Sequence, residues 1–134
     1  MQIMPMEGEV LNQVLAFLQR VTSGLCSLGV DPARIVLDPG IGFGKTVAQN
    51  FELLARQKEL LACGYPLVAG WSRKSSLAAV IGEPSSCGLP SPSHPRMVAS
   101  IAAAVLAVER GASVVRVHDV RETAQALKVL HAIQ

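Results

Sequence analysis

Apolar positions in this chain follow two alternating periods, one typical of helices and one typical of short buried strands. Over residues 8–28 they recur every three or four positions, as in an amphipathic helix that Gly29 would end. Short apolar runs predict three strands, at 35–38, 67–71 and 113–117. Helical patterns follow each run, at 50–64, at 75–81 and 96–110, and from 119 onward.

Local signals predict how these helices begin and end. Asn50 is a candidate cap for the 50–64 helix, and Gly64 is its expected stop. Asp119-x-x-Glu122 has the spacing of a capping box for the last helix. Residues 82–95 are rich in Pro, Ser and Gly and predict an irregular loop. The residues expected to face inward from the 50–64 helix are Leu53, Leu54, Leu60 and Leu61.

Strands that alternate with helices predict an α/β fold with a parallel sheet and right-handed crossovers. The 134 residues suffice for one domain, and the 50% apolar content fits a packed core. A closed eight-stranded α/β barrel takes about 250 residues, so this chain would supply roughly half of one. Three parallel strands alone would leave two open edges, which favour pairing with another chain.

Composition narrows the classes of partner. The net charge is only +2, and the single Trp and single Tyr leave no basic, aromatic stripe, so we expect no nucleic-acid partner. No apolar run reaches the ~20 residues that cross a bilayer, so no membrane partner is expected. Three widely spaced cysteines and no recognisable signal peptide favour free thiols in a reducing cytoplasm.

Polar motifs follow all three predicted strands. They are Asp38-Pro-Gly-Ile-Gly-Phe-Gly-Lys-Thr46, Ser72-Arg-Lys-Ser75 and Arg116-Val-His-Asp119. Ligands of parallel α/β folds bind beyond the carboxyl ends of strands, so these groups should converge on one pocket. An acid together with several cations suits a ligand that carries both hydrogen-bond donors and negative charge.

Each motif has a competing interpretation. The glycine loop is not a nucleoside-triphosphate loop, since position 39 is Pro where that motif needs Gly. A tight turn without a ligand remains an alternative. Cations at a helix start favour an anion site, but a solvated turn is also consistent. Arg116 and His118 are two positions apart on a predicted strand, so their side chains should point the same way. The alternative for Arg116 is a structural ion pair with Asp38 or Asp119. The alternative for His118 is a buried structural histidine.

The three motifs, in this order and spacing, resemble bacterial dihydropteroate synthase over nearly the whole chain. The resemblance implies a TIM barrel of which residues 1–134 form the C-terminal part, roughly strands six to eight. It implies condensation of 6-hydroxymethyl-7,8-dihydropterin pyrophosphate with para-aminobenzoate, giving dihydropteroate and pyrophosphate. Sulfonamides compete with para-aminobenzoate in this family, and magnesium assists the pyrophosphate, although its protein ligand would lie outside this chain.

The resemblance also implies roles for individual residues. Asp38 would accept hydrogen bonds from the pterin, and Lys74 would reach its carbonyl region. Arg116 would stack on the pterin, and with His118 would bind the pyrophosphate; Lys74, Arg116 and His118 would be the catalytic groups. Residues implied around the loop and the para-aminobenzoate edge are Gly42, Phe43, Arg73 and Ser75.

Because the family's remaining site residues lie in the other half of the barrel, this chain alone is expected to be inactive. Pairing through residues 96–110 and 121–132 would make it a homodimer. Two other interpretations stay open: a pterin-binding module of a corrinoid methyltransferase, which would not need Ser72-Arg-Lys-Ser75, and a non-catalytic truncated subunit.

Overall fold

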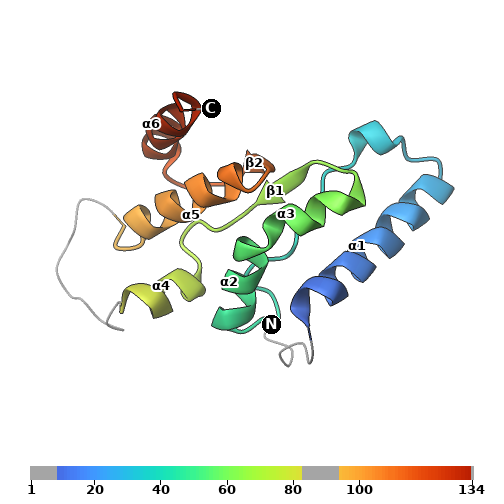
Figure 1. Ribbon diagram of the computed structural model, residues 1–134, viewed down its shortest axis with the longest axis horizontal. Helices are drawn as coiled ribbons and strands as arrows, with labels where there is room; N and C mark the ends of the chain where they lie inside the picture. The colour runs from blue at the N-terminus through green and yellow to red at the C-terminus, as the bar shows by residue number, and fades with distance from the viewer. Residues whose placement is uncertain (1–8, 83–93, 134) are drawn as a thin grey trace.

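A computed structural model describes residues 9–82 and 94–133. Two short strands form its centre, α1 lies along one flank, and α5 and α6 lie toward the other (Figure 1). The described elements, in order, are α1 (Val10–Ser27), η1 (Pro32–Arg34), α2 (Val47–Ala55), α3 (Gln57–Leu60), η2 (Leu61–Cys63), β1 (Leu67–Ala69), α4 (Ser75–Ile81), α5 (Met97–Glu109), β2 (Ala112–Val115) and α6 (Val120–His131).

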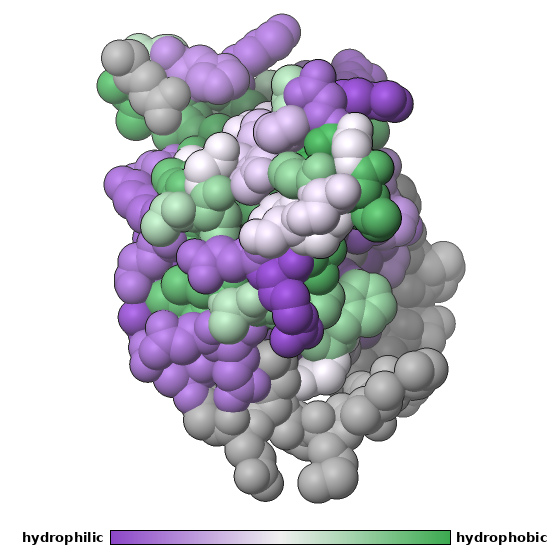
Figure 2. Space-filling view, turned by 90° about the vertical axis from the view of Figure 1, so that its right-hand side faces the viewer, coloured by the Kyte–Doolittle hydropathy of each residue, from purple (hydrophilic) through white to green (hydrophobic). Residues whose placement is uncertain are grey.

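The first helix confirms the amphipathic pattern. It buries one apolar stripe against the core and leaves the opposite face in solvent; the stripe consists of Val10, Leu11, Val14 and Leu18. The chain then leaves the helix through Gly29, whose φ of 86° favours glycine. On the flank where α1 lies, hydrophobic and hydrophilic residues are interspersed (Figure 2).

The two strands pair in parallel, which confirms the predicted sheet direction. Leu67 aligns with Ala112 and Ala69 with Val115. The predicted strand at 35–38 is wrong as an extended strand, because only Leu37 forms a bridge, to Leu67. The 3-10 turn η1 ends just before this segment and takes up the Ile35 N–H, so the backbone bonds to the β1 side are limited to those of Leu37, with Pro66 and Val68.

The predicted 50–64 helix is broken into α2, α3 and η2. Thr46, not Asn50, caps α2, through a capping box with Gln49. Asn50 is instead buried, where remote partners engage its amide. The prediction that Leu61 faces inward is wrong, since Leu61 lies in the 3-10 turn η2 and is 39% exposed. Gly64 ends the segment at φ 77°, as predicted.

The later helices match the expected positions. Helix α4 has the predicted bounds, and α5 packs against both β2 and α6. Asp119 precedes α6 but makes no capping bond, so the predicted capping box is wrong. Its carboxylate is engaged by Arg73 instead. Most of the predicted loop at 82–95 lies outside the described residues.

The core joins α1 and α2 to the strands and α5. Trp71 is its largest fully buried side chain, and its ring tilts against Phe51 with 5.2 Å between the ring centroids. The indole N–H of Trp71 is buried and has no hydrogen-bond partner among the described residues. Buried Gln57 donates to the carbonyl of Ala107 at 2.8 Å, tying α3 to the end of α5. Cys26 and Cys63 are free thiols. No described helix has the length and apolar character needed to traverse a bilayer.

Candidate active site

The three polar motifs meet near one edge of the sheet, just past the strand ends. Lys74, from the segment after β1, lies close enough to Arg116 and Asp38 for both charges to act on its pKa. The same Lys74 side chain lies against Gly42 and over the Phe43 ring. The parallel strands therefore bring together residues from three separate segments, as the sequence predicted.

Asp38 begins the glycine loop and shapes it. One carboxylate oxygen accepts the Gly40 N–H at 2.8 Å, which closes a short local turn. The other carboxylate oxygen has no partner among the described residues. The loop's carbonyl groups then receive Lys45, whose Nζ donates to Gly40 at 2.9 Å and to Phe43 at 3.1 Å. Burial lowers the pKa of Lys45, and the charge of Asp38 partly offsets this.

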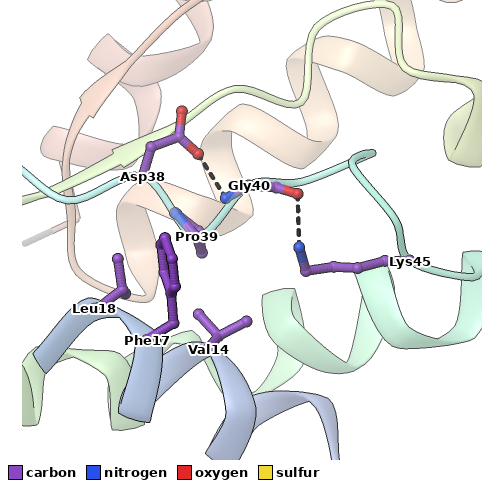
Figure 3. Close-up of a pocket in the computed structure, with 7 residues that line it drawn as sticks. All are labelled: Val14, Phe17, Leu18, Asp38, Pro39, Gly40 and Lys45. Carbon is purple, nitrogen blue, oxygen red and sulfur yellow. Dashed lines mark hydrogen bonds between the residues drawn. The ribbon is translucent and has the colours of Figure 1, made fainter. Parts of the chain in front are cut away.

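A shallow pocket of about 130 Å³ opens between this loop and α1 (Figure 3). Asp38 and Lys45 approach it from the loop side, and apolar residues of α1 form its floor. Its lining residues are Val14, Phe17, Leu18, Asp38, Pro39, Gly40 and Lys45.

Asn50 fixes the loop to the body of the protein. Its Oδ1 accepts the Gly42 N–H at 2.8 Å, and its Nδ2 donates to the Thr46 carbonyl and to Ser76 Oγ, both at 3.0 Å. The residue is 1% exposed, so these bonds are shielded from water. One buried amide thus joins the glycine loop to α2 and α4.

Lys74 lies beneath the loop that Asn50 holds. Its Nζ is 4.3 Å from the centre of the Phe43 ring, within the range of a cation–π contact. A Cβ atom at Gly42 would come within 3.0 Å of the Lys74 Cδ, so glycine makes this approach possible. Burial, and then the positive charge of Arg116, lower the pKa of Lys74, while Asp38 raises it.

Arg116 lies over the backbone of Gly70. A Cβ atom at Gly70 would be 2.7 Å from the guanidinium Nη2, so a side chain there would displace the cation. The expected alternative, an ion pair with Asp38 or Asp119, is not present among the described residues. Arg116 is exposed, so its donors are available to a ligand.

His118 is held by Ser72. The Ser72 hydroxyl lies 2.8 Å from His118 Nδ1 and accepts the His118 backbone N–H at 3.1 Å. Ser72 is 8% exposed, whereas the His118 side chain is exposed. His118 is therefore not a buried core histidine.

The other predicted residues lie beside this group. Arg73 has a φ of 60°, unusual for a residue with a side chain, and its Nη2 donates to Asp119 at 2.9 Å. Its backbone N–H donates to Ser100 Oγ at 2.9 Å. This guanidinium is thus already paired, while Ser75 is exposed at the start of α4.

No individual site role is predicted for Lys45, Asn50 or Ser72, although Ser72 belongs to the motif assigned to the para-aminobenzoate side. Both Lys45 and Ser72 lie within the predicted motifs. The available signal was that Lys45 follows Gly44 in the glycine loop and that Ser72 follows a predicted strand. Nothing local to Asn50 distinguishes it from a helix cap. Among residues 9–82 and 94–133, no three His, Cys, Asp or Glu side chains are grouped to hold a metal.

Comparison with known proteins places these features in context. Residues 1–118 match the family described as pterin binding enzyme. Dihydropteroate synthase from Haemophilus influenzae is 41% identical over 132 residues, which span 98% of this chain and 45% of that protein. The chain therefore spans about half the length of the curated relatives it matches.

Solved structures agree. Dihydropteroate synthase from Stenotrophomonas maltophilia, with imidazole in its active site, superposes with a TM-score of 0.89 at 41% identity, covering 99% of this chain and 48% of that one. The Xanthomonas albilineans enzyme with 4-aminobenzoic acid gives 0.88 at 40% identity, covering 97% and 45%. The Yersinia pestis enzyme with a sulfonamide drug gives 0.87 at 34%, covering 98% and 45%. The described α/β arrangement is thus part of a TIM barrel.

Proposed function

Because this chain belongs to the pterin binding enzyme family, we propose that it forms the C-terminal part of a dihydropteroate synthase active site. The reaction would join 6-hydroxymethyl-7,8-dihydropterin pyrophosphate to para-aminobenzoate, releasing pyrophosphate. The observation that carries this proposal is the meeting of the three polar motifs: Lys74 lies 4.3 Å from the Phe43 ring of the loop that Asp38 begins, and Ser72 lies 2.8 Å from His118.

Asp38 is proposed to recognise the pterin by hydrogen bonding. One of its oxygens is used by Gly40, and the second can accept a donor from the pterin's amino or ring N–H groups. Lys74 would donate to the pterin carbonyl region. Its lowered pKa follows first from burial, which indicates that its ammonium is partly withdrawn from water.

Arg116 and His118 would bind the departing pyrophosphate. As the bond from the pterin methylene carbon to the pyrophosphate oxygen breaks, negative charge grows on that oxygen, and two neighbouring donors would stabilise it. The aniline nitrogen of para-aminobenzoate then bonds to the methylene carbon and loses a proton. A planar guanidinium can also stack on the pterin ring.

The para-aminobenzoate would lie beside Phe43, Arg73 and Ser75, and sulfonamides would compete for the same place. Phe43 is 64% exposed and can cover a flat aromatic ligand. Arg73 is engaged by Asp119, so we assign it to holding this edge in shape, with Ser75 as the available donor.

A magnesium ion does not fit the described residues by themselves, because they group no three side chains suited to a metal. Any ion that accompanies the pyrophosphate would need ligands from elsewhere, so we derive no step through it.

A homodimer through α5 and α6 is also proposed. Apolar residues are exposed along these helices, and a partner's surface would remove them from water. The strongest examples are Val98 at 74%, Val120 at 65% and Val129 at 69% exposed.

Calorimetric titration with 6-hydroxymethylpterin and then pyrophosphate tests the proposal. We expect the wild-type chain to bind both weakly and to form no dihydropteroate alone. Asp38→Asn, which keeps an acceptor for Gly40, should abolish pterin binding. Asp31→Asn, at the residue that caps η1, should not. A wild-type chain that binds neither ligand would overturn the proposal.

A further inference from the structure

Ser72 and His118 form a two-point contact between the segments that follow β1 and β2. The Ser72 hydroxyl oxygen is 2.8 Å from His118 Nδ1 and 3.1 Å from the His118 backbone nitrogen, which donates to it. The two residues are 46 positions apart. The contact fixes both the position and the orientation of the imidazole ring.

The hydrogen-bonding capacity of Ser72 decides whether the hydrogen between the two side chains belongs to the Ser72 hydroxyl or to His118 Nδ1. A hydroxyl has one hydrogen to donate and two lone pairs that can accept. The backbone N–H of His118 already occupies one of these lone pairs on Ser72. If Nδ1 carried a hydrogen, it would fill the second, and the hydroxyl hydrogen of Ser72 would need an acceptor elsewhere. No other acceptor for it is found among the described residues, and Ser72 is 8% exposed. A buried O–H without a partner is unfavourable.

We infer that Ser72 is a positioning residue that donates its hydroxyl hydrogen to His118 Nδ1 and thereby keeps the neutral imidazole as the Nε2–H tautomer. In this arrangement every polar group of the pair is satisfied. The Nε2–H lies on the opposite side of the ring, where no described group bonds it, and the side chain is exposed. His118 thus presents a donor without needing a positive charge.

The use of that donor toward a pyrophosphate oxygen rests on the proposed function, whereas the tautomer does not. A ring held from behind enters the complex with little orientational freedom to lose, which favours binding. Arg116, two residues earlier, would supply the positive charge, and His118 would supply a hydrogen-bond donor in a fixed orientation.

Long-range ¹H–¹⁵N correlation spectra of the purified chain test the tautomer at alkaline pH, where imidazole is neutral. For wild type we expect a proton-bearing nitrogen shift at Nε2 and a bare nitrogen shift at Nδ1. Ser72→Ala should move both shifts toward the averaged values of a freely exchanging imidazole, and Ser72→Thr should restore them. Ser113→Ala, at an exposed serine of β2, is the matched control. A hydrogen on Nδ1 in wild type, or unchanged shifts in Ser72→Ala, would overturn the inference.

Pyrophosphate titration forms the second arm. Ser72→Ala should weaken binding roughly tenfold, as expected for one lost orienting hydrogen bond, with recovery in Ser72→Thr. Equal affinities for wild type and Ser72→Ala would contradict the positioning role. Failure of wild type to bind pyrophosphate would count against the proposed function, and the tautomer would still be decided by the spectra.

Discussion

The ammonium of Lys74 lies 4.3 Å from the centre of the Phe43 ring, although the two residues come from different loops of the site. The contact depends on Asn50, which holds the loop that carries Phe43, and on Gly42, which leaves room for the lysine side chain. The glycine loop therefore acts as a support for the lysine as well as a turn.

Replacing Phe43 with Ala should leave the fold largely intact but free the lysine. Phe43 is 64% exposed, so the free energy of unfolding should fall by less than about 1 kcal/mol. The ring current on the Lys74 ε-methylene protons should disappear, which proton NMR will detect. Phe43→Leu is the control that keeps the bulk of the side chain without the aromatic face. Persistence of the ring-current shift in Phe43→Ala would show that the two groups do not meet in solution.

The pKa of Lys74 should respond to its two charged neighbours in opposite directions. Arg116→Gln removes a repulsive charge and should raise this pKa, whereas Asp38→Asn removes an attractive one and should lower it further. Carbon NMR of ¹³Cε-labelled lysine measures both. Lys128→Gln, in α6, is a control that should leave the Lys74 titration unchanged.

The lowered pKa values also set the sign of a stability change. Between the folded-state pKa of Lys74 or Lys45 and the ordinary value of 10.5, the unfolded chain binds more protons. The contribution of these groups to the free energy of unfolding therefore rises with pH in that window. The variants Lys45→Met and Lys74→Met should flatten this rise in urea unfolding measured across alkaline pH; an unchanged slope would contradict the burial argument.

Gly70→Ala should impair anion binding without harming the fold. The added Cβ would meet the Arg116 guanidinium at 2.7 Å, and because this is the end of a flexible side chain, the cation will move. Pyrophosphate affinity should fall roughly ten- to hundredfold, as for a lost charge-assisted hydrogen bond. Calorimetry measures this loss.

Gly24→Ala provides the matched comparison for that variant. Its Cβ would meet nothing within 4 Å on α1, so it should raise the free energy of unfolding by about 0.5–1 kcal/mol and leave pyrophosphate binding unchanged. Equal binding by the Gly70→Ala and Gly24→Ala variants would exclude the proposed position of Arg116.

Asn50→Ala should destabilise the protein. It leaves the Gly42 N–H and Ser76 Oγ without their buried partner, and should cost about 2 kcal/mol in urea unfolding. Asn12→Ala, which removes an exposed bond to Glu9, should change stability by no more than about 0.5 kcal/mol. Similar losses in both variants would show that burial of the Asn50 amide does not matter.

The parts of the fold that local chemistry determines could be predicted from the sequence. Helix α4 has its predicted bounds because the apolar pattern and Gly82 act within one or two turns. Lys74 and Arg116 follow the paired parallel strands β1 and β2, and Asp38 follows the parallel bridge at Leu37, so all three lie toward the same edge.

Where prediction failed, a remote partner had displaced a local one. Asn50 and Asp119 both had the signature of helix caps, but Ser76, 26 positions away, engages the first and Arg73, 46 positions away, engages the second. Leu37 forms one bridge instead of a strand, and the turn before it uses the Ile35 N–H, which a ladder would otherwise need.

The amide of Asn50 also constrains how this protein can change over time. Because it serves the Gly42 backbone and the Ser76 hydroxyl together, a substitution at position 76 that removes the hydroxyl leaves one amide hydrogen unused in a sealed space. Positions 50 and 76 should then accept replacements in compatible pairs, so their variation among descendants of this chain would be correlated despite their separation in the sequence.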